Sequence, residues 1–257
     1  MNQPFPFFVF TIILLITSQC GSLSQNQDQK ITIATAANMQ FAMRKLATEF
    51  DKKTGIYCEL IISSSGKLTT QIKEGAPYDL FVSADLNYPI EIYKMGMADS
   101  TPITYAFGNL VLFTLDDTKP TFEGLTKKEV QHIAMANPKT APYGIAARET
   151  LESFNIYDNI KEKLVFGESI SQVNQFIMSG SAEIGFTSLS TVLSPKMKKK
   201  GQWILIPDTA YSPISQALVI LKRNDSTIQR SKQFVNFLFS NEGQKILSDF
   251  GYSLDEK

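Results

Sequence analysis

The most informative segment of this chain is SSSGKLTTQIKEGAPYDLFVSAD, which spans residues 63–85. It begins with small residues, continues through an amphipathic stretch at 68–74, turns at Gly75-Ala76-Pro77 and ends in an apolar run at 79–83. This pattern predicts a loop, a short helix, a turn and a buried strand. A loop of small residues before a helix presents backbone N–H groups at the positive end of the helix dipole. The segment therefore predicts a binding site for an anion.

Short apolar runs alternate with segments of period near 3.6 along the rest of the chain, which predicts an α/β fold. Strands are expected at 31–36, 57–62, 79–83, 110–115, 131–136, 164–166, 184–187, 203–206 and 217–221. Helices are expected after Asn38, which would be the N-cap, after Ser169, and at 145–154, 228–239 and 242–250. The two β-rich runs at 110–115 and 217–221 bracket a middle segment, which suggests an inserted lobe.

Composition excludes several functions. The 257 residues include 25 basic and 25 acidic ones, so no basic face for nucleic acid is expected. One histidine (His132) and two cysteines (Cys20 and Cys58) are too few for a His/Cys metal cage. A nucleophilic active site would need His132, which is better explained as a structural residue of a strand, and Cys58 as a buried strand residue.

The N-terminus has the pattern of an export signal. Residues 7–16 form an apolar core too short to span a bilayer unaided, and Cys20 and a polar tract follow it. We expect a signal peptide at 1–20 and a polar linker at 21–30, with lipidation of Cys20 as in a bacterial lipoprotein. Cleavage nearby without lipidation, or an uncleaved anchor, remain alternatives.

Four places share one pattern, in which a strand end, small or polar residues and a helix start follow one another. They are Ala37-Asn38, Ser64-Ser65-Gly66, Pro142-Tyr143-Gly144 and Ser169-Ile170-Ser171. Each offers first-turn N–H groups, and ligands of open α/β sheets collect beyond the carboxyl ends of strands. Each could equally be an ordinary capped helix. Asp79 and Asp85 make no convincing acid–base pair, since both could cap turns and helix starts.

The segment at 63–85 closely resembles the molybdate-binding proteins of ABC importers, a family of periplasmic substrate-binding proteins. Its most specific part is Gly-Ala-Pro-x-Asp-x-Phe-x-Ser-Ala-Asp at 75–85. Weaker matches follow in the family's order over about residues 30–253: AAN at 36–38, FAM at 41–43, YAFGNL at 105–110, PYG at 142–144, ESI at 168–170, AEIG at 182–185, NEGQKI at 241–246 and FGY at 250–252.

The resemblance implies a two-lobed class II periplasmic-binding-protein fold with the ligand in the cleft between the lobes. Lobe I would comprise residues 31–113 and 212–257, and lobe II residues 114–211. Carried over by position, the main ligand-binding residues would be Asn38, Ser65, Tyr143 and Ile170, the last two through backbone N–H groups. Ala37, Ser64, Gly66 and Ser188 are further candidates. Some members place a ligand-binding tyrosine near Ser188, and either Ser188 or Tyr143 could replace it here.

The implied function is capture of molybdate or tungstate outside the cytoplasmic membrane and delivery to the permease of an ABC transporter. The protein would be a monomer, lipid-anchored through Cys20, without cofactor, direct metal ligands or enzymatic activity. Three alternatives stay open: the same scaffold binding sulfate, thiosulfate or an organic anion; an enzyme on this scaffold; and the ligand-sensing domain of a regulator. The first alternative predicts saturable one-to-one binding without turnover, whereas an enzyme needs a titratable group in the cleft.

Overall fold

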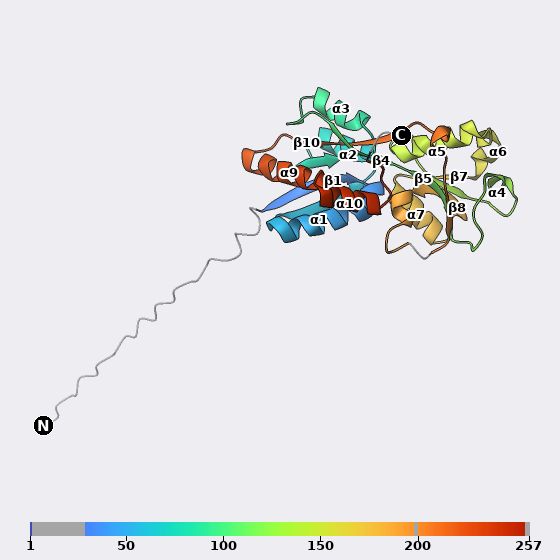
Figure 1. The fold of residues 1–257 in the computed structure, drawn as a ribbon, viewed down its shortest axis with the longest axis horizontal. Coiled ribbons are helices and arrows are strands. Elements are labelled where there is room, and N and C mark those ends of the chain that lie inside the picture. Colours follow the sequence, from blue (N-terminus) through green and yellow to red (C-terminus); the bar gives the residue numbers. More distant parts are fainter. Residues whose placement is uncertain (2–28, 198–199, 255–257) are drawn as a thin grey trace.

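The computed structural model describes residue 1, residues 29–197 and residues 200–254. The predicted signal peptide, with Cys20, lies outside the described residues. The rest forms two α/β lobes side by side, each around its own five-stranded sheet (Figure 1). The predicted α/β, two-lobed architecture is confirmed.

The first sheet has the strand order β2-β1-β3-β10-β4, in which β10 runs antiparallel to both neighbours. Its strands are β1 (Lys30–Ala36), β2 (Tyr57–Ser63), β3 (Leu80–Val82), β4 (Ile103–Gly108) and β10 (Ile214–Ile220). Its helices are α1 (Gln40–Thr54), α2 (Ser65–Lys73), α3 (Asn87–Lys94), α9 (Asp225–Leu238) and α10 (Asn241–Asp249), with the 3₁₀ turn η1 (Ala37–Met39) before α1.

Alternation along β1 explains why helices cover both faces of this sheet. Ile31 and Ile33 pack into one cluster with α1, α9 and α10, whereas Ala34 packs into another with α2 and α3. A strand buried on both faces reads as a continuous apolar run, as residues 31–36 do. Cys58, on β2, is buried as predicted, and burial raises the pKa of its thiol to about 12.

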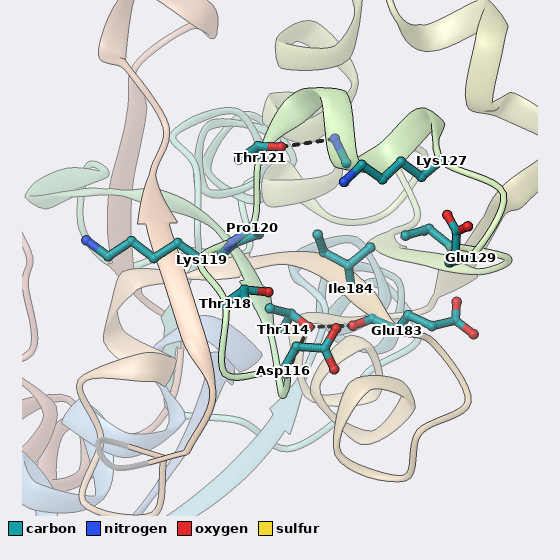
Figure 2. A pocket seen from close by; sticks show the side chains of 12 residues that line it. Thr114, Asp116, Thr118, Lys119, Pro120, Thr121, Lys127, Glu129, Glu183 and Ile184 are labelled. Atoms are coloured by element: carbon teal, nitrogen blue, oxygen red, sulfur yellow. Dashed lines mark hydrogen bonds between the residues drawn. The ribbon is translucent and has the colours of Figure 1, made fainter.

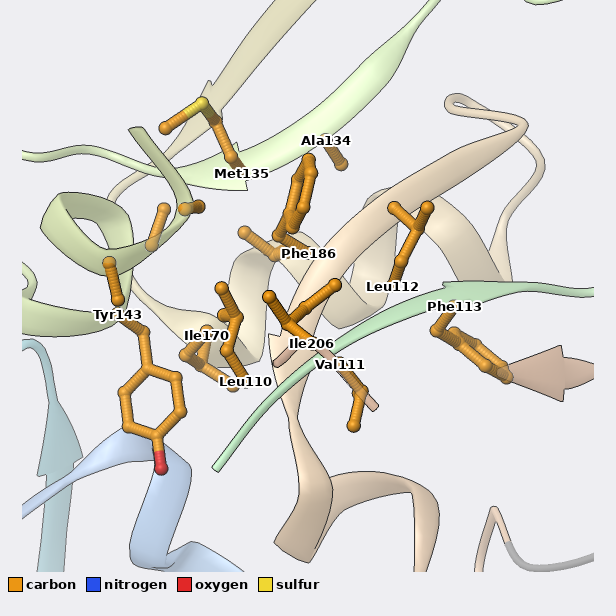
Figure 3. Packing of buried hydrophobic residues seen from close by; sticks show 14 of the residues in the cluster. Leu110, Val111, Leu112, Phe113, Ala134, Met135, Tyr143, Ile170, Phe186 and Ile206 are labelled. Carbon is orange, nitrogen blue, oxygen red and sulfur yellow. The ribbon is translucent and has the colours of Figure 1, made fainter. Parts of the chain in front are cut away.

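The second sheet has the order β7-β6-β8-β5-β9. Its strands are β5 (Leu110–Thr114), β6 (Ile133–Ala136), β7 (Leu164–Gly167), β8 (Ile184–Ser188) and β9 (Gln202–Leu205). Its helices are α4 (Phe122–Thr126), α5 (Pro142–Ser153), α6 (Tyr157–Ile160), α7 (Ile170–Met178) and α8 (Leu189–Val192), with the turns η2 (Lys161–Lys163) and η3 (Asp208–Ala210). One apolar cluster fills this lobe, and it includes Leu110, Met135, Ile170 and Phe186 (Figure 3).

Three sequence predictions need correction. The lobe boundary lies near Asn109, not after Phe113, because β5 pairs with β8 and β9 of the second sheet. Strand β4 (Ile103–Gly108) was not predicted. Asn38 does not cap a helix, because it lies inside η1, whose N-cap is Ala36.

The chain crosses between the lobes at two adjacent segments. It leaves the first lobe between Gly108 and Leu110 and returns through the segment before Ile214, which pairs with Gly108. The Tyr211 hydroxyl accepts a hydrogen bond from the Leu110 N–H at 3.2 Å. We refer to these paired crossings as the hinge, since they are the segments that connect the two lobes.

Candidate functional site

A small pocket lies between the lobes. All four predicted helix starts contribute to it. Its lining comprises Ala36, Ala37, Asn38, Ser64, Ser65, Ala84, Ala141, Pro142, Tyr143, Ser169 and Ile170. Strands β1, β2, β6 and β7 run parallel within their sheets and end at this pocket, so their following helices point their N-termini towards it.

Ser65 is the best-placed donor of the first lobe. It is the first residue of α2, only 1% exposed, and its N–H has no partner within a helix that begins there. Its hydroxyl oxygen accepts the N–H of Ala84 at 3.0 Å, which leaves the hydroxyl proton to donate into the pocket. The preceding Ser64 caps α2 by accepting the N–H of Lys67 at 3.4 Å.

Asn38 contributes differently from the expectation. Its side-chain Nδ2 donates to Gln216 Oε1 at 2.9 Å and to the Tyr252 hydroxyl at 3.1 Å. Both amide hydrogens are therefore used within the protein. What Asn38 can offer an anion is its backbone N–H, in the first turn of η1 beside Ala37.

The second lobe offers backbone donors at the starts of α5 and α7. Pro142, the first residue of α5, has no N–H, and the Gly144 N–H donates to Ala141 O at 2.8 Å. The N–H of Tyr143 is the donor that remains between them. Ile170 is the first residue of α7 and its N–H has no partner within the helix.

Two candidate residues do not line the pocket. The Gly66 N–H donates to Thr140 O of the other lobe at 2.9 Å, so this residue joins the lobes at the rim. The Ser188 hydroxyl is buried among those of Ser190 and Thr191, at 3.0 and 2.9 Å.

Of the two residues expected to replace a ligand-binding tyrosine, Tyr143 lines the pocket and Ser188 does not. The Tyr143 hydroxyl accepts a hydrogen bond from Gln216 Nε2 at 3.3 Å, and Gln216 is not among the lining residues.

The electrostatics of the pocket come from dipoles rather than from ions. Its lining, among the described residues, includes no charged side chain. Each helix start contributes about 0.3–1 kcal/mol of favourable interaction with an anion. Asp79 and Asp85 serve structural roles: Asp79 accepts the Thr32 N–H at 2.7 Å, and Asp85 accepts the Tyr88 N–H at 3.3 Å. Burial raises the pKa of the Asp85 carboxyl.

A larger hollow of about 470 Å³ lies at the far end of the second lobe, lined by Asp116, Lys119, Lys127, Glu129 and others (Figure 2). Its charged groups carry both signs, and it contacts only elements of one lobe. The Thr114 hydroxyl there donates to Glu183 O at 2.8 Å, a structural bond within the lobe. The hollow lacks the convergent donors of the inter-lobe pocket, so we assign the site to the latter.

Contacts across the rim show that the lobes are closed over the pocket. Besides the bond from Gly66 to Thr140, Lys67 Nζ lies 2.9 Å from Glu168 Oε2, and the Ser190 hydroxyl donates to Asn38 O at 2.6 Å. In these three contacts Asn38, Gly66 and Lys67 belong to the first lobe. Their partners Ser190, Thr140 and Glu168 belong to the second. A ligand in this pocket is enclosed by both lobes.

The polar groups behind the pocket were not among the residues predicted from the sequence. Gln216 and Tyr252 hold Asn38, yet both lie outside the four helix starts. A glutamine within the apolar run ISQALVI at 214–220 was the available signal, since a polar residue on a buried strand needs partners.

This fold and this site define a class of protein: a two-lobed binding protein that encloses a small polar ligand between its lobes. Comparison with known proteins gives the family. Residues 31–253 match the family described as bacterial extracellular solute-binding protein, and the chain belongs to that family. It is a family of binding proteins rather than of enzymes, which confirms the non-enzymatic prediction.

Individual relatives agree. The chain is 35% identical to molybdate-binding protein ModA of Rhodobacter capsulatus over 225 residues, covering 87% of this chain and 88% of the relative. It is 26% identical over 269 residues to YvgL of Bacillus subtilis, a putative ABC transporter substrate-binding lipoprotein, covering 99% and 100%. The solved periplasmic molybdate-binding protein of Azotobacter vinelandii superposes with a TM-score of 0.80 at 30% identity, covering 88% and 100%.

Proposed function

We propose that this protein captures molybdate or tungstate outside the cytoplasmic membrane and delivers it to the permease of an ABC transporter. The observation that carries the proposal is the enclosed pocket, in which four helix starts present neutral donors from both lobes. The molybdate-binding relatives support it. Asn38, Ser65, Tyr143 and Ile170 would supply the donors, and Ala37 and Ser64 would complete the walls.

The donor set explains the proposed selectivity. A fully deprotonated tetrahedral dianion only accepts hydrogen bonds, which suits a pocket of N–H and O–H groups. Phosphate carries a proton near neutral pH and needs an acceptor, which the uncharged lining does not supply. Sulfate has the same charge and shape as molybdate but is smaller, so its oxygens cannot reach donors of both closed lobes together.

We expect binding and closure to be one process. Donors from both lobes reach one anion only in the closed form, so the anion has more favourable contacts with that form than with an open one. The closed form is the one that would dock on the permease.

The family places the protein outside the cytoplasm. Lipidation of Cys20 would tether it there as a monomer, and replacing Cys20 by Ser should release it from membranes in cell fractionation.

Calorimetric titration of the full chain in mild detergent tests the proposal. Molybdate and tungstate should each bind one to one, with sulfate and phosphate weaker by at least about a hundredfold. Silence from molybdate and tungstate, with binding of sulfate or an organic anion, would assign the scaffold to the other ligand.

A further inference from the structure

We propose that Gln216, a fully buried glutamine on β10, is a positioning residue that ties together the anion-binding starts of η1 in the first lobe and α5 in the second. The inference rests on the proposed anion-binding function. It adds a residue that does not line the pocket and acts through Asn38 and Tyr143.

Gln216 makes three hydrogen bonds, and they reach both lobes. Its Oε1 accepts from Asn38 Nδ2 and from the Tyr105 hydroxyl, both at 2.9 Å, and its Nε2 donates to the Tyr143 hydroxyl at 3.3 Å. The side chain is 0% exposed, so any partner it loses leaves an unsatisfied buried group. Asn38 and Tyr105 belong to the first lobe and Tyr143 to the second.

On the first-lobe side, Gln216 fixes the residue that carries the N–H of η1. Asn38 is held at its side chain by Gln216 and Tyr252, and its carbonyl accepts from Tyr252 at 3.0 Å and from Ser190 at 2.6 Å. With these groups bound, η1 cannot rotate without breaking several buried hydrogen bonds. Its backbone N–H is thereby aimed at the pocket.

On the second-lobe side, Gln216 holds the first turn of α5 through a tyrosine ring. Tyr143 lies at the edge of the second-lobe apolar cluster, and its hydroxyl extends towards the N-terminal part of the first lobe, drawn in blue (Figure 3). The same residue lines the pocket, and its N–H is the donor left free in the first turn of α5. A bond to the ring therefore constrains the position of the Tyr143 N–H.

Two features of the hinge allow the side chains of Gln216 and Tyr143 to meet. A Cβ at Gly108 would collide with the Tyr143 hydroxyl and with Gln216 Nε2, so a larger residue at this crossing would displace both groups. The register of β10 against β4 shifts between Gln216 and Ala217, a bulge of the kind that redirects a side chain next to a functional site. Burial also raises the pKa of the Tyr143 and Tyr105 hydroxyls well above the ordinary value, so the contacts stay neutral.

The test is replacement of Gln216 by Met, which keeps the length of the side chain and removes its hydrogen bonds. Stopped-flow measurement on the full chain should show molybdate dissociating about tenfold faster, with the association rate within about twofold of the wild type. In the double variant with Tyr143→Phe, molybdate should dissociate less than about threefold faster than in Gln216→Met alone, because Gln216→Met already removes the link to Tyr143.

Thr114→Val is the matched control, because it deletes the two hydrogen bonds of a hydroxyl in the second lobe, to Glu183 O and from the Asp116 N–H, away from the hinge (Figure 2). It should lower the melting temperature and leave the dissociation rate unchanged. If Gln216→Met behaves like this control, with lower stability but wild-type dissociation, Gln216 is merely structural and the inference is overturned.

A measurement without ligand separates this inference from the proposed function. The Gln40 N–H, which donates to Ala37 O within η1 and does not depend on closure of the lobes, should exchange with solvent faster in Gln216→Met than in the wild type. Unchanged exchange would contradict the inference even if no anion bound. Should the Met variant fail to fold, Tyr143→Phe breaks the inter-lobe bond from its other end. Its molybdate dissociation should be faster, and without ligand the Gly144 N–H, which donates to Ala141 O in the first turn of α5, should exchange faster.

Discussion

At the scale of single residues, the site depends on side chains that hold backbone donors rather than on charges. The Ser65 hydroxyl both holds a backbone group, by accepting the Ala84 N–H, and can donate its own proton to an anion. Replacing Ser65 by Ala should raise the dissociation constant for molybdate about tenfold, the loss expected for one hydrogen bond to a charged group. Calorimetric titration measures the change.

Ser240→Ala is the control for this substitution. Ser240 caps α10 by accepting the Gly243 N–H at 3.3 Å, so its loss also removes a hydroxyl at a helix start, away from the pocket. Its melting temperature should fall by a few degrees with no change in affinity. Unchanged affinity in Ser65→Ala would remove Ser65 from the site.

The buried tyrosines give the protein a predictable alkaline limit. Burial raises the pKa of Tyr105, Tyr143 and Tyr252 above their ordinary value of about 10. Above that pH the unfolded chain releases phenol protons that the folded protein retains. The stability due to these groups is therefore fully present below about pH 10 and is lost as pH rises towards the folded pKa values.

Urea unfolding at pH 7 and between about pH 10 and 11.5 measures this loss. The free energy of unfolding should fall less steeply with pH in Tyr143→Phe than in the wild type, because one of the shifted groups has been removed. Equal slopes would mean that the Tyr143 hydroxyl ionises as freely in the folded protein as in the unfolded chain.

At the scale of elements, the start of α5 must pack tightly on β6. A Cβ at Gly144 would collide with the carbonyl oxygen of Ala136, the last residue of that strand. Gly144→Ala should push the first turn of α5 outward and carry the Tyr143 N–H with it. We expect at least about a tenfold loss of molybdate affinity, since an ångström of misplacement weakens a charge-assisted hydrogen bond strongly.

Gly124→Ala provides the comparison. Gly124 also lies within a helix, α4, but an added Cβ would meet only the Thr121 hydroxyl, at 3.3 Å. This variant should bind molybdate as the wild type does. An equal effect of the two substitutions would argue against a specific role for the packing of α5 on β6.

Much of this element scale could be predicted from the sequence. Apolar runs such as 31–36 and 184–187 gave correct strands, because both faces of these strands are buried and the pattern is local. The four helix starts meet as expected, because parallel strands bring their carboxyl ends to the same edge of the sheet.

Three features could not be predicted because they depend on contacts between residues that are distant in the sequence. Strand β4 begins with the exposed Ile103, so its local sequence pattern is weak evidence for a strand. Its pairing with β10, a contact between distant residues, establishes it. Leu110 and its neighbours are apolar enough for the core of either lobe, so only the pairing of β5 with β8 and β9 assigns this strand to the second sheet. The side chain of Asn38 finds Gln216 and Tyr252, 178 and 214 residues away, and no local pattern predicts those partners.

At the scale of the whole molecule, closure needs more than the contacts at the rim. Lys67 and Glu168 are 51% and 71% exposed, so their ion pair contributes about 0–1 kcal/mol. We therefore expect the anion, and not this ion pair, to supply most of the preference for the closed form. Small-angle scattering should show a smaller radius of gyration with molybdate than without it, and Lys67→Ala should keep this change with affinity within about threefold.

Equal scattering with and without molybdate would mean that the lobes stay closed regardless of ligand. Loss of the compaction in Lys67→Ala would instead make the rim ion pair the main source of closure. Either result would contradict an anion-driven mechanism.

The most direct measurement is the position of the metal itself. Crystals of the protein grown with molybdate should give one anomalous peak at the molybdenum edge, between the first turns of η1, α2, α5 and α7. The oxygens around this peak should lie within hydrogen-bond reach of Ser65, Tyr143 and Ile170. A peak elsewhere on the molecule, or an inter-lobe pocket without molybdenum at saturating molybdate, would contradict the assignment of the site.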